Sequence, residues 1–290
     1  MKISVSSYSF NQYLRDGRMT QIETVKKAAE MGFDGIEFIS LSPCENPTKE
    51  QQLDYARQIK AEAEKYGIEI VAYCVGANFY HENEEDRAKA VAAICDDVDV
   101  AAELGAKIVR HDLTAGINVG GRVISYDRQI PILAECARKV TEYAEKKGIR
   151  TCTENHGTVS QDSDRIERFY NAVAHDNFGV LVDVGNFACV DEDSVSAVSR
   201  LAPYAFHVHA KDFYITKFGV ESPRGKGGIT RGCNTIHGSV IGEGDIPVEQ
   251  CIAILKKAGY DGYVTIEYEC KEDCMEGIAR GLKNLRSFIE

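Results

Sequence analysis

Residues 129–154 read QIPILAECARKVTEYAEKKGIRTCTE. The stretch Gln129–Lys147 has the pattern of a charged amphipathic helix, and Gly148 fits the left-handed residue that commonly ends a helix. Arg150–Glu154 then reads as a short strand that ends in a carboxylate. The same unit of helix, glycine and strand recurs along most of the chain, and it decides the predicted fold.

Eight strands and eight helices are predicted to alternate along the 290 residues. The predicted strands are Lys2–Ser7, Gly35–Ser40, Ile68–Val75, Lys107–Arg110, Arg150–Glu154, Gly179–Asp183, Ala205–His209 and Tyr263–Glu267. The predicted helices are Gln21–Met31, Lys49–Tyr66, Glu84–Leu104, Gln129–Lys147, Ser163–Val173, Ser194–Leu201, Val248–Ala258 and Met275–Phe288. Such alternation indicates a parallel sheet, and eight units at this length predict a single (β/α)8 TIM barrel over residues 1–290. An open doubly wound sheet is the alternative, but no glycine-rich phosphate loop follows the first strand.

One connection, from Phe213 to Ile246, is much longer than the others. It is rich in glycine and includes the run Pro223-Arg224-Gly225-Lys226-Gly227-Gly228. Loops of this length in a compact domain are usually functional or disordered. Because this loop leaves the face of a barrel that carries the active site, we expect residues 213–246 to cover the active-site mouth as a lid. Arg224–Gly228 either binds phosphate or simply bends the chain.

The composition is that of an ordinary globular protein with an acidic balance. Hydrophobic residues make up 44% of the chain, charged residues 27%, and the net charge is −11. An acidic chain lacks the basic footprint that nucleic acid requires, and no apolar run is long enough to span a membrane. The ten cysteines are dispersed without a CxxC pair, and the first ten residues contain no signal-peptide core. We therefore expect a cytoplasmic protein with reduced thiols and no nucleic-acid or membrane partner; a homo-oligomer stays open.

The chemistry is concentrated in Phe206-His207-Val208-His209-Ala210-Lys211-Asp212. Residues two apart on a strand face the same way, so His207 and His209 share a face. If that face is the inside of a barrel, His209 lies nearer the mouth and is a candidate metal ligand or general base. A pair of hydrogen-bonded core histidines is the alternative for this stretch alone.

Other predicted strands also end in polar residues. Glu154, Asp183 and Glu267 join His209 at the mouth. Three carboxylates packed together repel one another unless a cation lies among them. Oxygen-rich ligands with one nitrogen suit a single divalent ion, with Mn²⁺ favoured and Mg²⁺, Co²⁺ or Zn²⁺ as alternatives. The competing interpretation pairs each carboxylate with its own lysine or arginine.

Five segments resemble the xylose isomerase-like TIM-barrel superfamily, and within it the sugar phosphate isomerase/epimerase group. They are Gly35–Glu37, Thr153–His156, Val182–Asn186, His207–Asp212 and Asp261–Glu269. The resemblance implies that Glu154, Asp183, His209 and Glu267 hold one divalent metal ion. It also implies that His111, His156 and Lys211 contact a sugar or cyclitol substrate. Glu37, Asn186 and Arg224 complete the expected substrate contacts.

Departures from the family pattern narrow the expected activity. The abasic-site endonuclease branch has a histidine where this chain has Asn186, and the strand at Val71–Cys74 offers none. The two-metal site and lysine motif of the large xylose isomerases are also missing. A one-metal sugar isomerase or epimerase remains, and endonuclease activity is disfavoured.

The expected reaction is proton abstraction next to a carbonyl, with an enediolate stabilised by the metal and Glu154 and Glu267 as base and acid. Dehydration of a keto-inositol (inosose) on the same site is the first alternative, and a non-catalytic sugar-binding barrel is the second. Asp212 either orients Lys211 or makes a surface ion pair. His207 is expected to pack and hydrogen-bond below His209.

Overall fold

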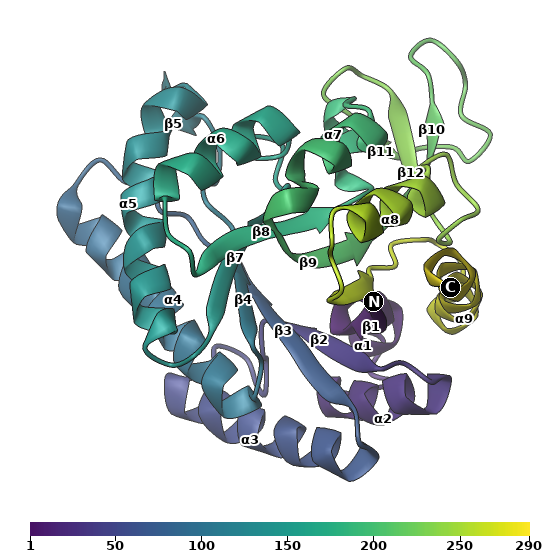
Figure 1. Cartoon of the computed structure of the whole chain (residues 1–290), viewed down its shortest axis with the longest axis horizontal. Coiled ribbons are helices and arrows are strands. Elements are labelled where there is room, and N and C mark those ends of the chain that lie inside the picture. The colour runs from purple at the N-terminus through teal and green to yellow at the C-terminus, as the bar shows by residue number, and fades with distance from the viewer.

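The computed structural model describes residues 1–290, and eight of its strands form a closed parallel barrel (Figure 1). Around the barrel the order is β1-β13-β9-β8-β7-β4-β3-β2. The bounds are β1 Lys2–Ser6, β2 Gly35–Ile39, β3 Glu69–Val75, β4 Ile108–His111, β7 Arg150–Glu154, β8 Phe178–Asp183, β9 Ala205–Ala210 and β13 Tyr263–Ile266. Every predicted strand is present, with ends that differ by one residue or none, so the (β/α)8 prediction is confirmed.

Helices surround the barrel as an outer layer (Figure 1). They are α1 Asn11–Arg15, α2 Gln21–Met31, α3 Lys49–Tyr66, α4 Glu84–Leu104, α5 Tyr126–Glu145, α6 Ser163–Val173, α7 Ser194–Leu201, α8 Val248–Lys257 and α9 Cys274–Ile289. Gly32, Gly67 and Gly105 end their helices with φ of 85°, 66° and 87°, as the predicted left-handed caps require. The short helix α1 was not predicted, and α5 begins three residues earlier than expected.

The buried residues form two groups. A cluster of 64 hydrophobic residues forms the main core. A second cluster of six includes Cys74, Cys152 and Leu181. Cys152 and Leu181 stand two residues before Glu154 and Asp183 on the same strands, so by strand alternation they lie on the same inner face. On the side of β7 and β8, the barrel interior is therefore apolar below the carboxylates of Glu154 and Asp183.

The long connection is ordered. It contains a three-stranded antiparallel sheet in the order β10-β12-β11, with β10 Asp212–Thr216, β11 Gly228–Ile229 and β12 Thr235–Ser239. A second excursion, the hairpin of β5 Asn118–Val119 and β6 Arg122–Val123, follows β4. Both stand at one end of the barrel (Figure 1).

Asp212 fixes the base of the long connection. Its carboxylate accepts hydrogen bonds from the backbone N–H groups of Phe213, Gly242, Gly244 and Ile246, at 2.8 to 3.1 Å. The side chain is buried. Both predicted roles were wrong, because Asp212 neither touches Lys211 nor lies at the surface.

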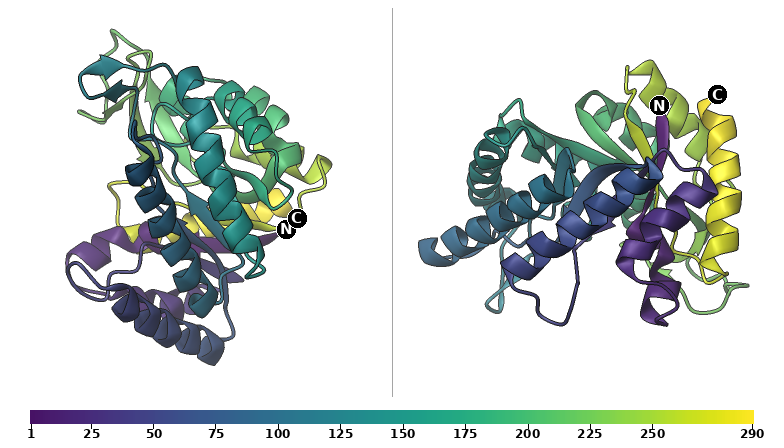
Figure 2. Two further views of the ribbon diagram at one scale, coloured as in Figure 1. Left: turned by 90° about the vertical axis from the view of Figure 1, so that its left-hand side faces the viewer. Right: turned by 90° about the horizontal axis from the view of Figure 1, so that it is seen from below.

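The two termini lie close together, with α9 beside β1 (Figure 2). None of the helices combines the length and the apolar character needed to cross a bilayer.

Candidate active site

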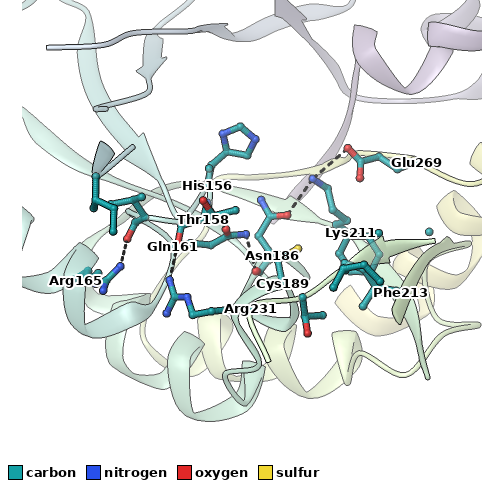
Figure 3. A pocket seen from close by; sticks show the side chains of 18 residues that line it. His156, Thr158, Gln161, Arg165, Asn186, Cys189, Lys211, Phe213, Arg231 and Glu269 are labelled. Atoms are coloured by element: carbon teal, nitrogen blue, oxygen red, sulfur yellow. Dashed lines mark hydrogen bonds and ion pairs between the residues drawn. The ribbon is translucent and has the colours of Figure 1, made fainter. Parts of the chain in front are cut away.

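A cavity of about 840 Å³, the mouth cavity, opens at the C-terminal ends of the barrel strands (Figure 3). Its wall comes from the segments that follow β7, β8, β9 and β13, together with the small sheet. Active sites of (β/α)8 proteins lie at this face. The polar side chains in the wall include His156, Gln161, Asn186, Lys211, Arg231 and Glu269.

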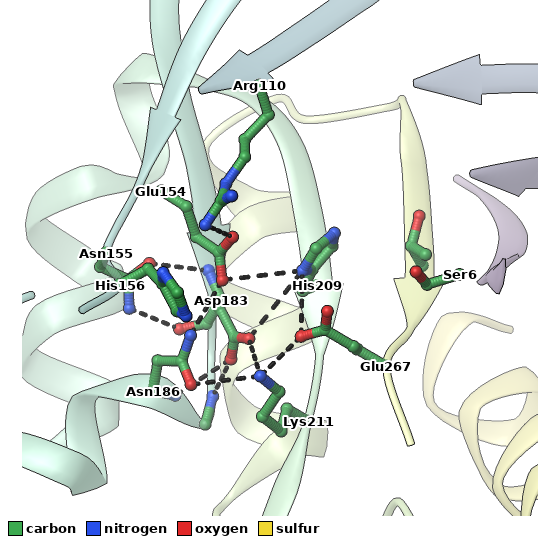
Figure 4. Close-up of polar contacts among 12 residues, drawn as sticks. Ser6, Arg110, Glu154, Asn155, His156, Asp183, Asn186, His209, Lys211 and Glu267 are labelled. Atoms are coloured by element: carbon green, nitrogen blue, oxygen red, sulfur yellow. Dashed lines mark hydrogen bonds and ion pairs between the residues drawn. The ribbon is translucent and has the colours of Figure 1, made fainter. Parts of the chain in front are cut away.

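Four buried side chains meet at the inner end of this mouth (Figure 4). Glu154, Asp183, His209 and Glu267 each offer one ligand atom, and these atoms all lie within 4.8 Å of one another. They come from β7, β8 and β9 and from the residue after β13, which are four consecutive positions around the barrel. Asp183 Oδ2 and His209 Nδ1 are buried and form no hydrogen bond, and the lysine nearest to Asp183 Oδ2 is Lys211, with Nζ at 3.2 Å. This is a candidate metal-binding cluster, because three carboxylates surround a buried imidazole nitrogen that has no hydrogen-bond partner.

The imidazole of His209 is oriented from below. Its Nε2 donates to Glu37 Oε2 at 2.9 Å, which turns Nδ1 toward the three carboxylates at 3.5 to 3.9 Å. His207 Nε2 contacts the same Glu37 oxygen at 3.0 Å and the hydroxyl of Thr265 at 2.9 Å. A carboxylate behind a ligating imidazole fixes its tautomer and increases its basicity. His207 therefore packs below His209, as predicted.

Glu154 is held at both of its oxygens. Arg110 Nη2 lies 2.7 Å from Oε2, and Asn186 Nδ2 donates to Oε1 at 2.9 Å. The same guanidinium contacts Asp112 at 2.9 Å, and Asp112 contacts His156 Nδ1 at 3.0 Å. The hydrogen bond that His156 donates to the Asp112 carboxylate raises the pKa of His156 above its usual value. A chain of charged groups, exposed at His156 and buried at Arg110, thus connects the mouth to Glu154.

Lys211 offsets the negative charge of Glu267 and Asp183 on the other side of the cluster. Its Nζ lies 2.5 Å from Glu267, 3.2 Å from Asp183 and 3.3 Å from Asn186 Oδ1. Burial disfavours the charge of Glu267, but Lys211 and His209 outweigh burial and hold its pKa well below the usual range. Burial raises the pKa of Asp183 to about 6 against the opposing effect of Lys211. Neighbouring carboxyl groups with different proton affinities are typical of acid–base sites.

Comparison with known proteins gives the family. The family model described as a xylose isomerase-like TIM barrel matches residues 25–288. This chain belongs to that family. An inosose dehydratase of Mesomycoplasma hyopneumoniae (strain J) is 23% identical over 285 residues, covering 92% of this chain and 88% of that protein.

Two solved structures have the same fold as this chain. D-psicose 3-epimerase from Clostridium cellulolyticum H10 has a TM-score of 0.77 and 19% identity, with 100% of both chains covered. The IOLI protein, whose crystal structure contains a zinc atom, has a TM-score of 0.73 and 15% identity over 100% of this chain and 98% of that one. At these identities the likeness is one of fold.

Three of the six residues predicted to contact substrate lie in the mouth cavity: His156, Asn186 and Lys211. The other three do not. Glu37 is fully buried beneath His209, so it supports the candidate ligand and cannot reach a substrate.

The structure also places His111 and Arg224 outside the lining of the mouth cavity. His111 is fully buried against Phe79, and burial lowers its pKa to about 4, so it is a neutral core residue. Arg224 lies in a separate cavity, stacked over Tyr214 with 3.4 Å from the guanidinium carbon to the ring centroid.

Arg110 and Asp112 are the residues that the sequence-based site prediction omitted. A signal was present, because successive side chains of a strand point to opposite faces. Arg110 and His111 are adjacent, so only one of them can face the interior. The prediction chose His111, although an arginine beside three carboxylates is electrostatically the better interior residue.

Proposed function

We propose that this member of the xylose isomerase-like family is a metal-dependent sugar isomerase or epimerase that moves a proton on the carbon next to a carbonyl. The observation that carries the proposal is the convergence of Glu154, Asp183, His209 and Glu267, with His209 Nδ1 buried among the three carboxylates and without a hydrogen bond. These four residues would hold one divalent ion. Three carboxylates and one imidazole suit Mn²⁺, Mg²⁺, Co²⁺ or Zn²⁺, and Mn²⁺ is our first choice. When bound, the ion supplies Lewis-acid polarisation of the substrate carbonyl.

Glu267 and Glu154 would be the base and the acid. They lie at the two ends of the run of strands β7-β8-β9-β13, so they approach a sugar in the mouth from different sides. Arg110 and Asn186 fix the carboxylate of Glu154, and Lys211 fixes that of Glu267. Glu267, kept ionised by Lys211 and His209 at Oε2, would take the proton at Oε1, and Glu154 would return one from its own Oε1. Carboxylates fixed in this way move a proton with little reorganisation.

His156, Asn186 and Lys211 would bind the hydroxyl groups of the substrate. The Nδ1 of His156 is engaged by Asp112, and its Nε2 makes no hydrogen bond to protein. Lys211 and Asn186 reach the cavity from the candidate cluster. We also propose that the small sheet β10-β12-β11 covers the bound sugar, since Phe213 and Ile236 line the same cavity.

Dehydration of a keto-cyclitol is the second candidate, favoured by the relatives that are inosose dehydratases. The same carboxylate would remove a proton next to the carbonyl, and the hydroxyl group on the following carbon would leave as water. His156 would give that hydroxyl its proton from Nε2, since contact with Asp112 favours the protonated imidazole.

One exchange experiment separates these reactions. The metal-reconstituted protein is incubated in D₂O with ketohexoses, ketopentoses and a keto-inositol, and the products are followed by NMR and mass spectrometry. Deuterium in an otherwise intact sugar supports an epimerase or isomerase, whereas loss of water from the keto-inositol supports the dehydratase. Glu154→Gln and Glu267→Gln should each reduce the rate at least about a hundredfold.

The matched control is Glu249→Gln, an exposed glutamate in the first turn of α8, and it should keep the wild-type rate. Metal binding without exchange or dehydration on any substrate would instead mean a sugar-binding barrel without catalysis. Unchanged exchange in Glu154→Gln or Glu267→Gln would exclude that residue as the acid or base.

A further inference from the structure

The small sheet has a second cavity on its other face. Phe213 of β10 lines the mouth cavity, whereas its neighbour Tyr214 lines a cavity of about 370 Å³. His237 of β12 is paired directly across from Tyr214, and cross-strand partners share a face. Four residues line both cavities: Gly228, Ile236, Gly238 and Glu269. The sheet therefore separates the mouth from a neighbouring polar pocket.

The imidazole of His237 is buried in this pocket without a partner. The residue is only 8% exposed, and neither Nδ1 nor Nε2 forms a hydrogen bond. An imidazole always carries at least one N–H donor, and a buried donor without an acceptor is unfavourable. Gly227 lies against the ring, because a Cβ there would come within 2.7 Å of Nε2. The glycine-rich stretch thus wraps a histidine that requires an acceptor.

Two cations without carboxylate partners line the same pocket. The Arg224 guanidinium is stacked over Tyr214, which fixes its plane. Lys271 Nζ reaches only the backbone carbonyl of Lys226, at 3.4 Å. In addition, the backbone N–H group of Gly227, which also lines the pocket, donates to no backbone acceptor. These donors come from separate segments and surround one volume.

Two carboxylates also line the pocket, but both have cations elsewhere. Glu272 Oε2 lies 2.8 Å from Arg280, and Glu269 Oε1 lies 3.6 Å from Lys211. The charges of Arg224 and Lys271 therefore remain uncompensated within the pocket. An acceptor with a negative charge would satisfy both cations and the imidazole together.

We propose that this pocket binds a single phosphate group, held by Arg224, Lys271 and His237. A planar guanidinium, an ammonium group, an imidazole N–H and a free backbone N–H match an acceptor with several oxygens. The phosphate is either free in solution or carried by a sugar. The site is distinct from the candidate metal cluster, and its occupancy does not depend on the proposed reaction.

Calorimetric titration with inorganic phosphate, fructose 6-phosphate and fructose tests the proposal. Inorganic phosphate should bind saturably in the millimolar range or tighter, and fructose should not compete with it. Binding of the sugar phosphate alone would support the site and identify a sugar as the carrier. Because no turnover is measured, the result is independent of whether the proposed isomerase activity is correct.

Variants locate the bound phosphate. Arg224→Gln and Lys271→Gln change exposed side chains, and each should weaken binding about tenfold or more. Lys226→Gln removes the same charge from the same stretch without lining the pocket, so its affinity should stay within about twofold. Arg231→Gln, which changes the mouth cavity, should also leave the affinity unchanged.

Addition of phosphate should also shift the ring resonances of His237 in NMR spectra, assigned with His237→Gln. The proposal is overturned if neither inorganic phosphate nor fructose 6-phosphate binds saturably. It is equally overturned by affinities that fall as much in Arg231→Gln or Lys226→Gln as in Arg224→Gln.

Discussion

Replacing Glu37 by glutamine tests whether the carboxylate beneath His209 tunes the candidate metal site. Glu37 is fully buried, and its Oε2 accepts from His207 at 3.0 Å and from His209 at 2.9 Å. The two histidines hold the pKa of Glu37 far below its usual range despite the opposing effect of burial. Glutamine keeps the shape and one oxygen acceptor but removes the charge. The substitution therefore isolates the charge from the packing.

The two hydrogen bonds to Glu37 set the expected loss of stability in the glutamine variant. Each hydrogen bond to a charged acceptor contributes about 1.5–3 kcal/mol, and each neutral one about 0.5–1.5 kcal/mol. Glu37→Gln removes the charge from two such bonds, but an amide is easier to bury than a carboxylate. The net effect should be a free energy of unfolding that is lower by about 1–3 kcal/mol. Loss of a carboxylate behind a ligating imidazole should also weaken metal binding about 10- to 100-fold.

Metal affinity is measured on metal-free protein by competition with a chromogenic chelator, and stability by urea unfolding of the same samples. His207→Gln is the matched control, since it alters the other donor to Glu37 but leaves the contact with His209. It should change the unfolding free energy while metal affinity stays within about threefold. A Glu37→Gln protein that binds metal within about twofold of wild type would refute the tuning role.

Three further substitutions test the rest of the structure. Burial raises the pKa of Asp97 to about 7. The folded chain then keeps a proton that the unfolded chain releases, so the free energy of unfolding falls from about pH 4 to pH 7. After allowance for partial exposure, Asp97→Asn should raise the free energy of unfolding, measured in urea, by about 2 kcal/mol at pH 8 but little at pH 4. Asp212→Ala leaves four backbone N–H donors unpaired, so it should cost about 3 kcal/mol and make residues 213–246 sensitive to limited proteolysis. Gly185→Ala would place a Cβ 2.6 Å from the carbonyl oxygen of Lys211, and the forced shift should cost about 1–3 kcal/mol in thermal unfolding.

The barrel and the candidate ligands could be predicted because both follow from local patterns. Glycine caps mark where each helix ends, and the side chain at a strand end is fixed by its position in the unit. Glu154, Asp183, His209 and Glu267 could be placed together without any distance information, since the C-terminal ends of parallel barrel strands meet at one mouth. The structure brings these four together as the sequence indicated.

The partners of these four residues depend on which face each side chain occupies. His111 and Arg110 differ by one position, and a one-residue difference on a strand exchanges interior for exterior. Glu37 stands on the correct face but lies below the mouth, because it is the middle residue of β2, Gly35–Ile39, and not the residue at the strand end. Which side chains meet at that depth depends on the register between strands, which no single strand records.

The long connection was the hardest part to predict, since its function depends on pairings between distant residues. Arg224 was assigned to the substrate because residues 213–246 leave the active-site face. In the structure, β10 pairs with β12 in antiparallel register, and this pairing places Tyr214 and His237 on the face that points away from Phe213. The stacking of Arg224 on Tyr214 then takes the arginine to the same face. A register shifted by one residue on β12 would instead turn His237 toward the mouth and separate it from Arg224 and Tyr214. The register of a single two-stranded pairing therefore decides whether the imidazole joins the arginine in one pocket.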